Sequence, residues 1–327
     1  MKAEIISIAV SLALSIICCG AFVRTMREKR VGQPILGYVE EHKSKQGTPT
    51  MGGLAFIIPV TAVFLIINGV KGKVAFVSAM IGLGYLCVGF LDDYLKLRNK
   101  KNEGLRPYQK IIFQTLLSLF AGVYACVNGL TYFFIPFSRT GVQLGWWAFP
   151  IISLVFVAIT NSVNLTDGLD GLAGMTSLTY LASFAFIITL QRNVFTTLAL
   201  PETEYRAVIG LICCLCGGLC GFLLYNVNRA QLFMGDTGSL SLGGFIGAIS
   251  IFTSDSFFIP IVGIMFVTSS ISVIIQVMHY KRTKKRVFLM APFHHHLQMK
   301  GHGETQIAVG YSLVTLIFGL FSALAYL

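Results

Sequence analysis

Polar residues recur at every third position of residues 161–174, a segment that joins two strongly apolar stretches of the chain. They are Asn161, Asn164, Asp167 and Asp170. Residues three apart lie close together on a helix, so consecutive members are predicted to share one helix face. Ionisable groups facing lipid cost roughly 2.5–3.5 kcal/mol each, so these side chains should face water, a metal ion or a polar substrate. The alternative is a polar connector whose glycines serve helix packing.

Two adjacent carboxylates, Asp92 and Asp93, follow another long apolar segment. Successive residues of a helix point about 100° apart, so one carboxylate can hold a divalent cation while the other meets a second ligand. Negative charge at a helix C-terminus also opposes the macrodipole, which disfavours a merely solvated helix end. We therefore predict a functional role for this pair.

A third polar segment, residues 226–239, contains Gly235 and Asp236 just before an apolar stretch. A carboxylate and neighbouring hydroxyls at a predicted helix start lie where free backbone amides attract phosphate. Asp236 could instead be a plain N-cap, and Asn226 a C-cap. Both interpretations stay open at this point.

Residues 45–53 combine Lys45 and Thr50 with a proline and paired glycines. Proline and glycine fix a turn and are expected to leave backbone amides open, as anion-binding loops require. An equal alternative is a helix-entry turn with Thr50 as the N-cap.

Three consecutive histidines, His294, His295 and His296, follow a basic run at 281–286. Zinc binding is disfavoured, because adjacent residues cannot easily all reach one ion and no cysteine lies nearby. Imidazole donates hydrogen bonds and titrates near neutrality, so phosphate or pyrophosphate is the better expectation.

Long apolar segments must position these polar ones. The 327-residue chain is 55% hydrophobic and only 12% charged, too apolar for a soluble domain. We predict an all-α integral membrane protein with residues 1–327 in a single polytopic bundle. Ten segments are predicted to span the bilayer, of which the eighth is short. They are 4–23, 52–69, 74–91, 110–127, 148–164, 171–190, 206–225, 239–253, 257–279 and 305–325.

Lysine and arginine are distributed unevenly between the two sides of this predicted bundle. The connections after spans one, three, seven and nine hold 19 of the 25, which predicts that they are cytoplasmic and that both termini lie outside. The net charge of +11 then suits anionic lipid and anionic substrates, and no motif indicates nucleic acid. The predicted catalytic segments, all cytoplasmic, are 24–51, 92–110, 160–172, 226–239 and 280–304.

Five of the six aspartates and all six histidines fall on this predicted cytoplasmic side. Separate loops that present carboxylates and basic groups at one membrane face suit Mg²⁺-dependent phosphoryl transfer. Mg²⁺ binds one or two carboxylates plus phosphate oxygens, and it neutralises charge on a transferring phosphate. Mg²⁺ is therefore the expected cofactor, and Mn²⁺ is expected to substitute for it.

The motifs at residues 45–53, 92–93, 161–174, 233–239 and 291–301 resemble those of the bacterial phospho-N-acetylmuramoyl-pentapeptide-transferases. This family lies within the polyprenyl-phosphate N-acetylhexosamine-1-phosphate transferase superfamily. The wider superfamily shares the aspartate pair and the Asn-x-x-Asp-Gly-x-Asp-Gly stretch. The Thr-Pro-Thr-Met-Gly-Gly and Pro-Phe-His-His-His-Leu motifs resemble the muramoyl-pentapeptide branch.

The resemblance implies ten helices, both termini outside and a multi-pass location in the bacterial cytoplasmic (inner) membrane. It implies transfer of phospho-MurNAc-pentapeptide from UDP-MurNAc-pentapeptide to undecaprenyl phosphate, which yields lipid I and UMP. This is the first membrane step of peptidoglycan synthesis. A homodimer is left open.

The resemblance also implies residue roles. Asp236 is expected to bind Mg²⁺ with Asp167 in the metal region, while Asp92 lies nearest the attacking lipid phosphate. Asp93 is expected to position the lipid phosphate or the metal, and Phe233 to stack on uracil. The histidines correspond to residues on the pyrophosphate side. The remaining candidates for substrate binding are Lys45, Thr50, Asn164, Asp167, Asp170, Asn226 and Gly235.

Two departures from the family pattern put loop shape in doubt. Arg229 stands where proline is expected, and residues 32–37 lack a usual arginine. The lipid phosphate brings its own oxyanion, so one-step attack is favoured over a covalent aspartyl intermediate. Two alternatives remain: another superfamily transferase that uses a different UDP-HexNAc, and a transporter. Transporters place such carboxylates near the bilayer midplane, which disfavours the second.

Overall fold

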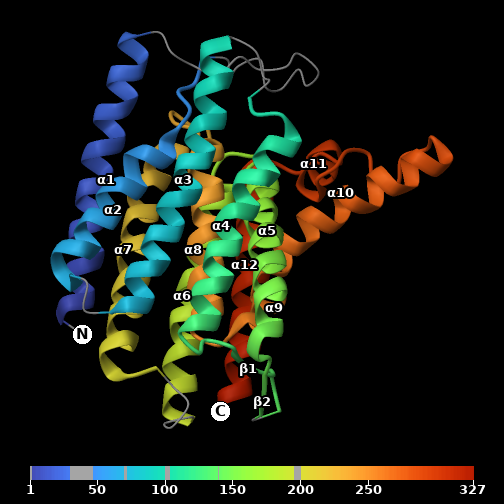
Figure 1. The fold of residues 1–327 in the computed structure, drawn as a ribbon. Helices are drawn as coiled ribbons and strands as arrows, with labels where there is room; N and C mark the ends of the chain where they lie inside the picture. Colours follow the sequence, from blue (N-terminus) through green and yellow to red (C-terminus); the bar gives the residue numbers. More distant parts are fainter. Residues whose placement is uncertain (1, 30–46, 70–71, 100–103, 139, 195–199) are drawn as a thin grey trace.

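The alternation of apolar and polar segments produces a bundle of long helices in the computed structural model of the chain (Figure 1). The structure describes all residues except 1, 30–46, 70–71, 100–103, 139 and 195–199. Within that described part, the strands form a single two-stranded antiparallel hairpin. The predicted all-α class is confirmed.

The elements follow one another along the chain with these bounds. The long helices are α1 (Lys2–Glu28), α2 (Gly52–Asn68), α3 (Lys73–Asn99), α4 (Pro107–Val127), α5 (Ala148–Thr166), α6 (Leu172–Val194), α7 (Glu202–Asn226), α8 (Gly235–Phe252), α10 (Ile264–Thr283) and α12 (Glu304–Ala323). The short elements are β1 (Tyr132–Phe134), β2 (Gly141–Gln143), α9 (Ile259–Val262), α11 (Phe293–Met299) and the 3-10 turns η2 (Gly145–Trp147), η3 (Ser256–Phe258) and η4 (Leu324–Tyr326).

Helix α8 lies at the centre of the bundle. Every residue from Thr237 to Phe252 is buried, and α2, α3 and α5 pack around it. Gly89 allows α3 to approach closely, because a Cβ at that position would overlap the carbonyl oxygen of Asp236. The polar end of α3 is therefore held against the first turn of α8.

Eight helices in the described part of the chain are long and apolar enough to cross a membrane. The predicted spans at 52–69 and 239–253 form α2 and α8, which are not among those eight. Helix α2 has only 17 residues. Helix α8 is covered by other helices, so its surface does not need the apolar character of a lipid-facing helix. The count of ten spans stays a prediction.

The predicted ninth span, residues 257–279, is not one continuous helix. It is divided into η3, α9 and α10, and Gly263 interrupts the helical conformation between α9 and α10. Helix α10 then leaves the bundle and extends sideways past α11 (Figure 1). Its exposed apolar side chains include Ile271, Ile274 and Val277.

The bundle has two distinct ends. Both chain termini lie at one end together with β1 and β2, which we call the terminal end (Figure 1). Helices α1 and α3 run from there to the opposite end, which also carries α11 and which we call the site end. The predicted location of both termini outside the membrane stays a prediction. Which side of a membrane each end faces stays a prediction.

Candidate active site

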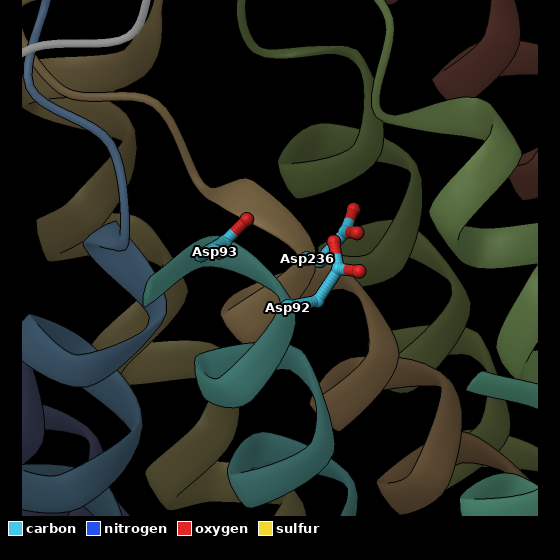
Figure 2. A group of neighbouring side chains, drawn as sticks. All are labelled: Asp92, Asp93 and Asp236. Carbon is cyan, nitrogen blue, oxygen red and sulfur yellow. The ribbon is translucent and has the colours of Figure 1, made fainter. Parts of the chain in front are cut away.

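Three carboxylates meet at the site end. Asp92 and Asp93 come from α3, and Asp236 comes from the first turn of α8 (Figure 2). Each offers one oxygen atom, and these oxygens all lie within 4.8 Å of one another. Asp92 and Asp93 are each only 3% exposed. The two sequence motifs, 143 residues apart, thus form one anionic cluster.

The adjacent aspartates of α3 point in different directions, as predicted. Oδ2 of Asp93 accepts hydrogen bonds from the Thr237 backbone N–H (2.9 Å) and hydroxyl (2.7 Å), so this carboxylate fixes the first turn of α8. Oδ1 of Asp92 instead accepts a hydrogen bond from the Leu105 N–H at 2.8 Å. Figure 2 shows the Asp92 side chain beside that of Asp236, with Asp93 set apart.

Two lysines that the sequence motifs did not indicate partly neutralise this cluster. Lys96 Nζ lies 2.6 Å from Asp92 Oδ2, 2.9 Å from Asp236 Oδ2 and 3.5 Å from Asp93 Oδ1. Lys110 Nζ lies 2.8 Å from the same Asp236 Oδ2. The spacing of Lys96, four residues after Asp92, was a detectable helical ion-pair signal. Lys110 gave no such local signal, because its partner lies on another helix.

Of the four polar residues spaced by three, Asn164 makes direct contact with the cluster. Its Nδ2 donates to Asp236 Oδ1 (2.7 Å) and to Ser239 Oγ (2.9 Å). Asn161 lies one turn deeper in the bundle, where its Nδ2 donates to Gln114 Oε1 at 2.7 Å. Asn164 is therefore positioned at the carboxylates, whereas Asn161 joins α5 to α4.

The expectation that all four share a helix face is wrong, because α5 ends at Thr166. Asp167 is the C-cap, and Asp170 lies in the following turn, where Gly171 adopts a φ of +75° that favours glycine. Asp170 Oδ2 accepts from the Ala230 N–H at 2.9 Å, so it fastens this turn to the loop after α7.

Asp167 keeps partial exposure at the end of α5. The pKa of its carboxyl is raised to about 8, mainly because the surrounding protein shields it from water. The negative charges of Asp236 and Asp93 contribute to the same shift. Asp167 therefore experiences the field of the cluster.

The segment before α2 is bound to the segment before α8. The Gly52 N–H donates to the Phe233 carbonyl (2.9 Å), the Gly53 N–H to the Met234 carbonyl (3.1 Å), and the Phe233 N–H to the Pro49 carbonyl (2.8 Å). The prediction of open amides is thus wrong for both glycines, because backbone carbonyls occupy them. The Phe233 side chain keeps partial exposure. Lys45 lies outside the described residues.

Thr50 and Gly235 lie beside Asp93. A Cβ on Gly235 would meet Asp93 Oδ2 at 2.5 Å and Thr50 Oγ1 at 2.9 Å, and the φ of Gly235 is +71°. A side chain at this position would disturb both the turn and the carboxylate. These two predicted substrate-binding residues therefore adjoin the cluster.

Asn226 connects the loops around the site. Its Oδ1 accepts from the Gly171 N–H (3.1 Å), and its Nδ2 donates to the Leu232 carbonyl (2.9 Å). Three residues later, Arg229 has a φ of +62°. Proline cannot adopt this backbone angle, so the loop has a shape here that the expected proline would not allow. The other departure, at residues 32–37, lies outside the described residues.

The three histidines occupy three different environments. His294 is fully buried against Gly168, and neither of its ring nitrogens has a hydrogen-bond partner. Burial is the main cause that lowers the pKa of His294 to about 3, and the neighbouring His295 contributes to the shift. The His294 imidazole is therefore neutral. His295 Nδ1 lies 3.1 Å from Gln298 Oε1, while His296 Nδ1 accepts from the Leu289 N–H at 3.2 Å. Their contact with pyrophosphate stays a prediction.

The donor set fits a hard divalent cation. Carboxylate oxygens are the protein ligands that Mg²⁺ prefers, and the three grouped side chains present them from two rigid helices. Asp236 is the residue that would hold the ion, with Asp92 and Asp93 beside it as the other carboxylates of the group. Asp167 is not a member of this mutually close group, and its expected metal role stays a prediction.

A helix bundle with a carboxylate–lysine cluster at one end is a framework for membrane-embedded group transfer, and comparison with known proteins gives its class. Residues 74–254 match the model of glycosyl transferase family 4. Residues 45–57 match phospho-N-acetylmuramoyl-pentapeptide-transferase signature 1. The chain belongs to the phospho-N-acetylmuramoyl-pentapeptide-transferase family, which confirms the resemblance seen in its motifs.

Relatives of that name align over nearly the whole chain. The protein from Clostridium botulinum (strain Alaska E43 / Type E3) is 38% identical over 320 residues, which cover 98% of this chain and 95% of the relative. The protein from Desulfitobacterium hafniense is 36% identical over 325 residues, with 98% and 96% covered. The protein from Thermoanaerobacter sp. (strain X514) is 38% identical over 314 residues, with 96% and 95% covered.

Proposed function

We propose that this protein transfers phospho-MurNAc-pentapeptide from UDP-MurNAc-pentapeptide to undecaprenyl phosphate, with lipid I and UMP as products. The observation that carries the proposal is the meeting of Asp92, Asp93 and Asp236 with two lysines at one end of an apolar bundle. Family membership supplies the identity of the substrates. The signature at residues 45–57 favours the muramoyl-pentapeptide donor over another UDP-HexNAc.

In this reaction an oxygen of the lipid phosphate bonds to the phosphorus next to the sugar. The bond from that phosphorus to the bridging oxygen breaks, and the bridging oxygen leaves with UMP. A bound Mg²⁺ would supply charge neutralisation at the diphosphate. Asn164 fixes the orientation of Asp236, and Asp93 fixes the start of α8 through Thr237. Lys96 and Lys110 supply positive charge beside the reacting phosphates.

The geometry supports a one-step transfer. Both Asp92 oxygens are engaged, one by the Leu105 N–H and one by Lys96. Because both oxygens already have partners, the carboxylate is a weaker nucleophile. The acceptor phosphate already carries negative charge near pH 7, so it needs little activation. Asp92 is then assigned to orienting the lipid phosphate.

We place the site end in the bacterial cytoplasm, since the connections there carry most of the lysine and arginine residues. The protein would then be a multi-pass protein of the cytoplasmic membrane with both termini outside. A tag at Leu327 should be reachable in intact cells, while a cysteine replacing Lys285 should react with an impermeant maleimide only after permeabilisation. The reverse labelling pattern would contradict this orientation.

The direct test is release of UMP by the purified full-length protein in detergent micelles. The assay contains UDP-MurNAc-pentapeptide, undecaprenyl phosphate and Mg²⁺, with Asp236→Asn as the matched control. We expect turnover that stops in excess EDTA and returns with Mg²⁺ or Mn²⁺. Comparable turnover with UDP-GlcNAc would shift the assignment to another transferase of the superfamily.

A further inference from the structure

Lys96 and Lys110 are paired with the carboxylate group to which the proposed metal would bind. Oδ2 of Asp236 accepts both ammonium groups, at 2.9 and 2.8 Å, while its Oδ1 accepts the Asn164 amide at 2.7 Å. A carboxylate oxygen has about two lone-pair sites. Oδ2 of Asp236 is therefore fully occupied by cations of this chain.

A divalent cation could not simply be added to this arrangement. An ammonium group and a metal ion on one carboxylate oxygen would repel each other at short range, and Mg²⁺ requires its oxygen ligands in close contact. The lysines are free to leave, because each ammonium group ends a flexible four-carbon chain. Their side chains are 20% and 17% exposed, so both reach solvent without movement of a helix.

We infer that Lys96 and Lys110 are exchangeable counter-ions of the carboxylate cluster. They neutralise Asp236 while no metal is bound, release it when a divalent cation binds, and then pair with the diphosphate of the donor. The first step stands on the ion pairs of this chain, and the second also on the fit of the carboxylate group to a divalent cation. The last step rests on the proposed function.

The charge balance explains the use of such an exchange. Three carboxylates and two ammonium groups leave one negative charge in excess, which would repel a diphosphate. With a divalent cation added, the same set has one positive charge in excess. Metal binding thus changes the sign of the net charge of the cluster. It also leaves the two ammonium groups available to pair with phosphate, which ammonium binds readily. The cluster would then accept the donor after the metal and not before it.

The decisive measurement is Mn²⁺ affinity in the absence of substrate, followed by the paramagnetic resonance signal of free Mn²⁺. The full-length protein in micelles is compared with Lys110→Met, Lys96→Met and the exposed-lysine control Lys285→Met. Removing a competing cation should tighten Mn²⁺ binding about tenfold in Lys110→Met, a change of about 1.4 kcal/mol. Lys96→Met should change affinity in the same direction, Lys285→Met should match wild type, and Lys110→Arg should stay close to it.

Affinity that is unchanged or weaker in both lysine-to-methionine variants would overturn the exchange. Each variant is also compared with wild type in thermal melting, and Asp236→Asn must abolish the binding that is measured. If Lys110→Met alone fails to fold, Lys96→Met still decides between the two outcomes.

A second measurement tests the last step. With Mg²⁺ saturating, UDP should bind about tenfold more weakly to Lys110→Met than to wild type, and Lys110→Arg should restore most of the affinity. Equal UDP affinity in all three would remove the diphosphate from the inference and leave the metal exchange intact. A protein that shows the Mn²⁺ effect but no lipid transfer would contradict the proposed function, not the exchange.

Discussion

Helix α8 has an aspartate near each end, and the two carboxylates differ in the number and charge of their polar partners. Asp236 in its first turn meets two other carboxylates, two ammonium groups and an amide. Asp255, just beyond its last turn, is fully buried and accepts a 2.6 Å hydrogen bond from the Tyr326 hydroxyl. Its other oxygen has no hydrogen-bond partner. The first carboxylate can exchange cations, whereas the second holds parts of the chain together.

The surroundings of Asp255 are structural. The Phe134 N–H donates to the Ser254 carbonyl at 2.9 Å, and Gln191 Nε2 donates to the Thr253 carbonyl at 3.1 Å. The turn after α8 therefore binds the hairpin, α6 and the last turn of the chain. Burial raises the pKa of the Asp255 carboxyl to about 8. The difference teaches that partners, and not the residue type or the helix, decide whether a buried acid can do chemistry.

The largest expected difference between the two acids is in catalysis. Asp236→Ala should lower UMP release at least about a thousandfold, a change of ~4 kcal/mol, because it removes the carboxylate that pairs with both lysines and would bind the proposed metal. Asp255→Asn should leave turnover within about threefold of wild type, since it changes no group at the site end. A loss in Asp255→Asn comparable to that in Asp236→Ala, in protein that melts normally, would break the distinction.

Asp92 sharpens the comparison within the cluster itself. Asp92→Asn should lower turnover about a hundredfold, ~2.7 kcal/mol, because it removes an anion that orients the lipid phosphate and Lys96. The concentration of Mg²⁺ at half-maximal rate should change little, whereas Asp236→Asn should raise it strongly.

A single-turnover experiment without undecaprenyl phosphate separates the two mechanisms. Wild type should release no UMP under this condition, because the acceptor itself makes the attack. Stoichiometric UMP would indicate a covalent aspartyl intermediate and would exclude the one-step transfer.

Much of this division could be predicted from the sequence, and the missed parts have a common cause. The positions of Asp92, Asp93 and Asp236 were found because carboxylates at the ends of apolar segments are costly without a partner. Helix existence followed from long apolar runs. The ion pair between Lys110 and Asp236 could not be predicted, because it depends on how α4 packs against α5 and α3, which lie beside α8.

The same limit explains the wrong expectations. The amides of Gly52 and Gly53 have carbonyl partners 181 residues further along the chain, which no local pattern indicates. The break at Gly263 and the departure of α10 from the bundle lie within a continuous apolar stretch, where composition favours one straight helix. The sequence did not indicate a role for Asp255 or Tyr326, because their role depends on a hydrogen bond between residues far apart in the chain.

The pH dependence of stability should separate the two ends. The folded-state pKa of Asp255 is about 8, against an ordinary value of 3.8, so the folded protein binds the extra proton between these values. The contribution of this carboxyl to the free energy of unfolding should therefore be fully present below about pH 4 and be lost as the pH rises towards 8. The loss should reach roughly 2 kcal/mol between pH 6 and pH 8.

Asp255→Asn cannot titrate and serves as the matched control for this effect. Its melting temperature in micelles should lack the part of the decline between pH 6 and pH 8 that wild type owes to this carboxyl. Parallel melting curves for the two proteins across that range would show that the buried carboxyl does not carry the effect.

The smallest expected effect concerns the hydrogen bond that closes the terminal end. Tyr326→Phe removes one buried donor to Asp255 and should cost about 1 to 2 kcal/mol of stability, with turnover unchanged. In the Asp255→Asn background the same substitution should cost clearly less, because the charge-assisted part of the bond is already gone. Measured as a double-mutant cycle in thermal melting at about pH 9.5, where the Asp255 carboxyl is ionised, the coupling isolates the pair. Additive losses of stability would show that Asp255 and Tyr326 act independently. The hydrogen bond between them would then not explain why a carboxyl is buried at the end of α8.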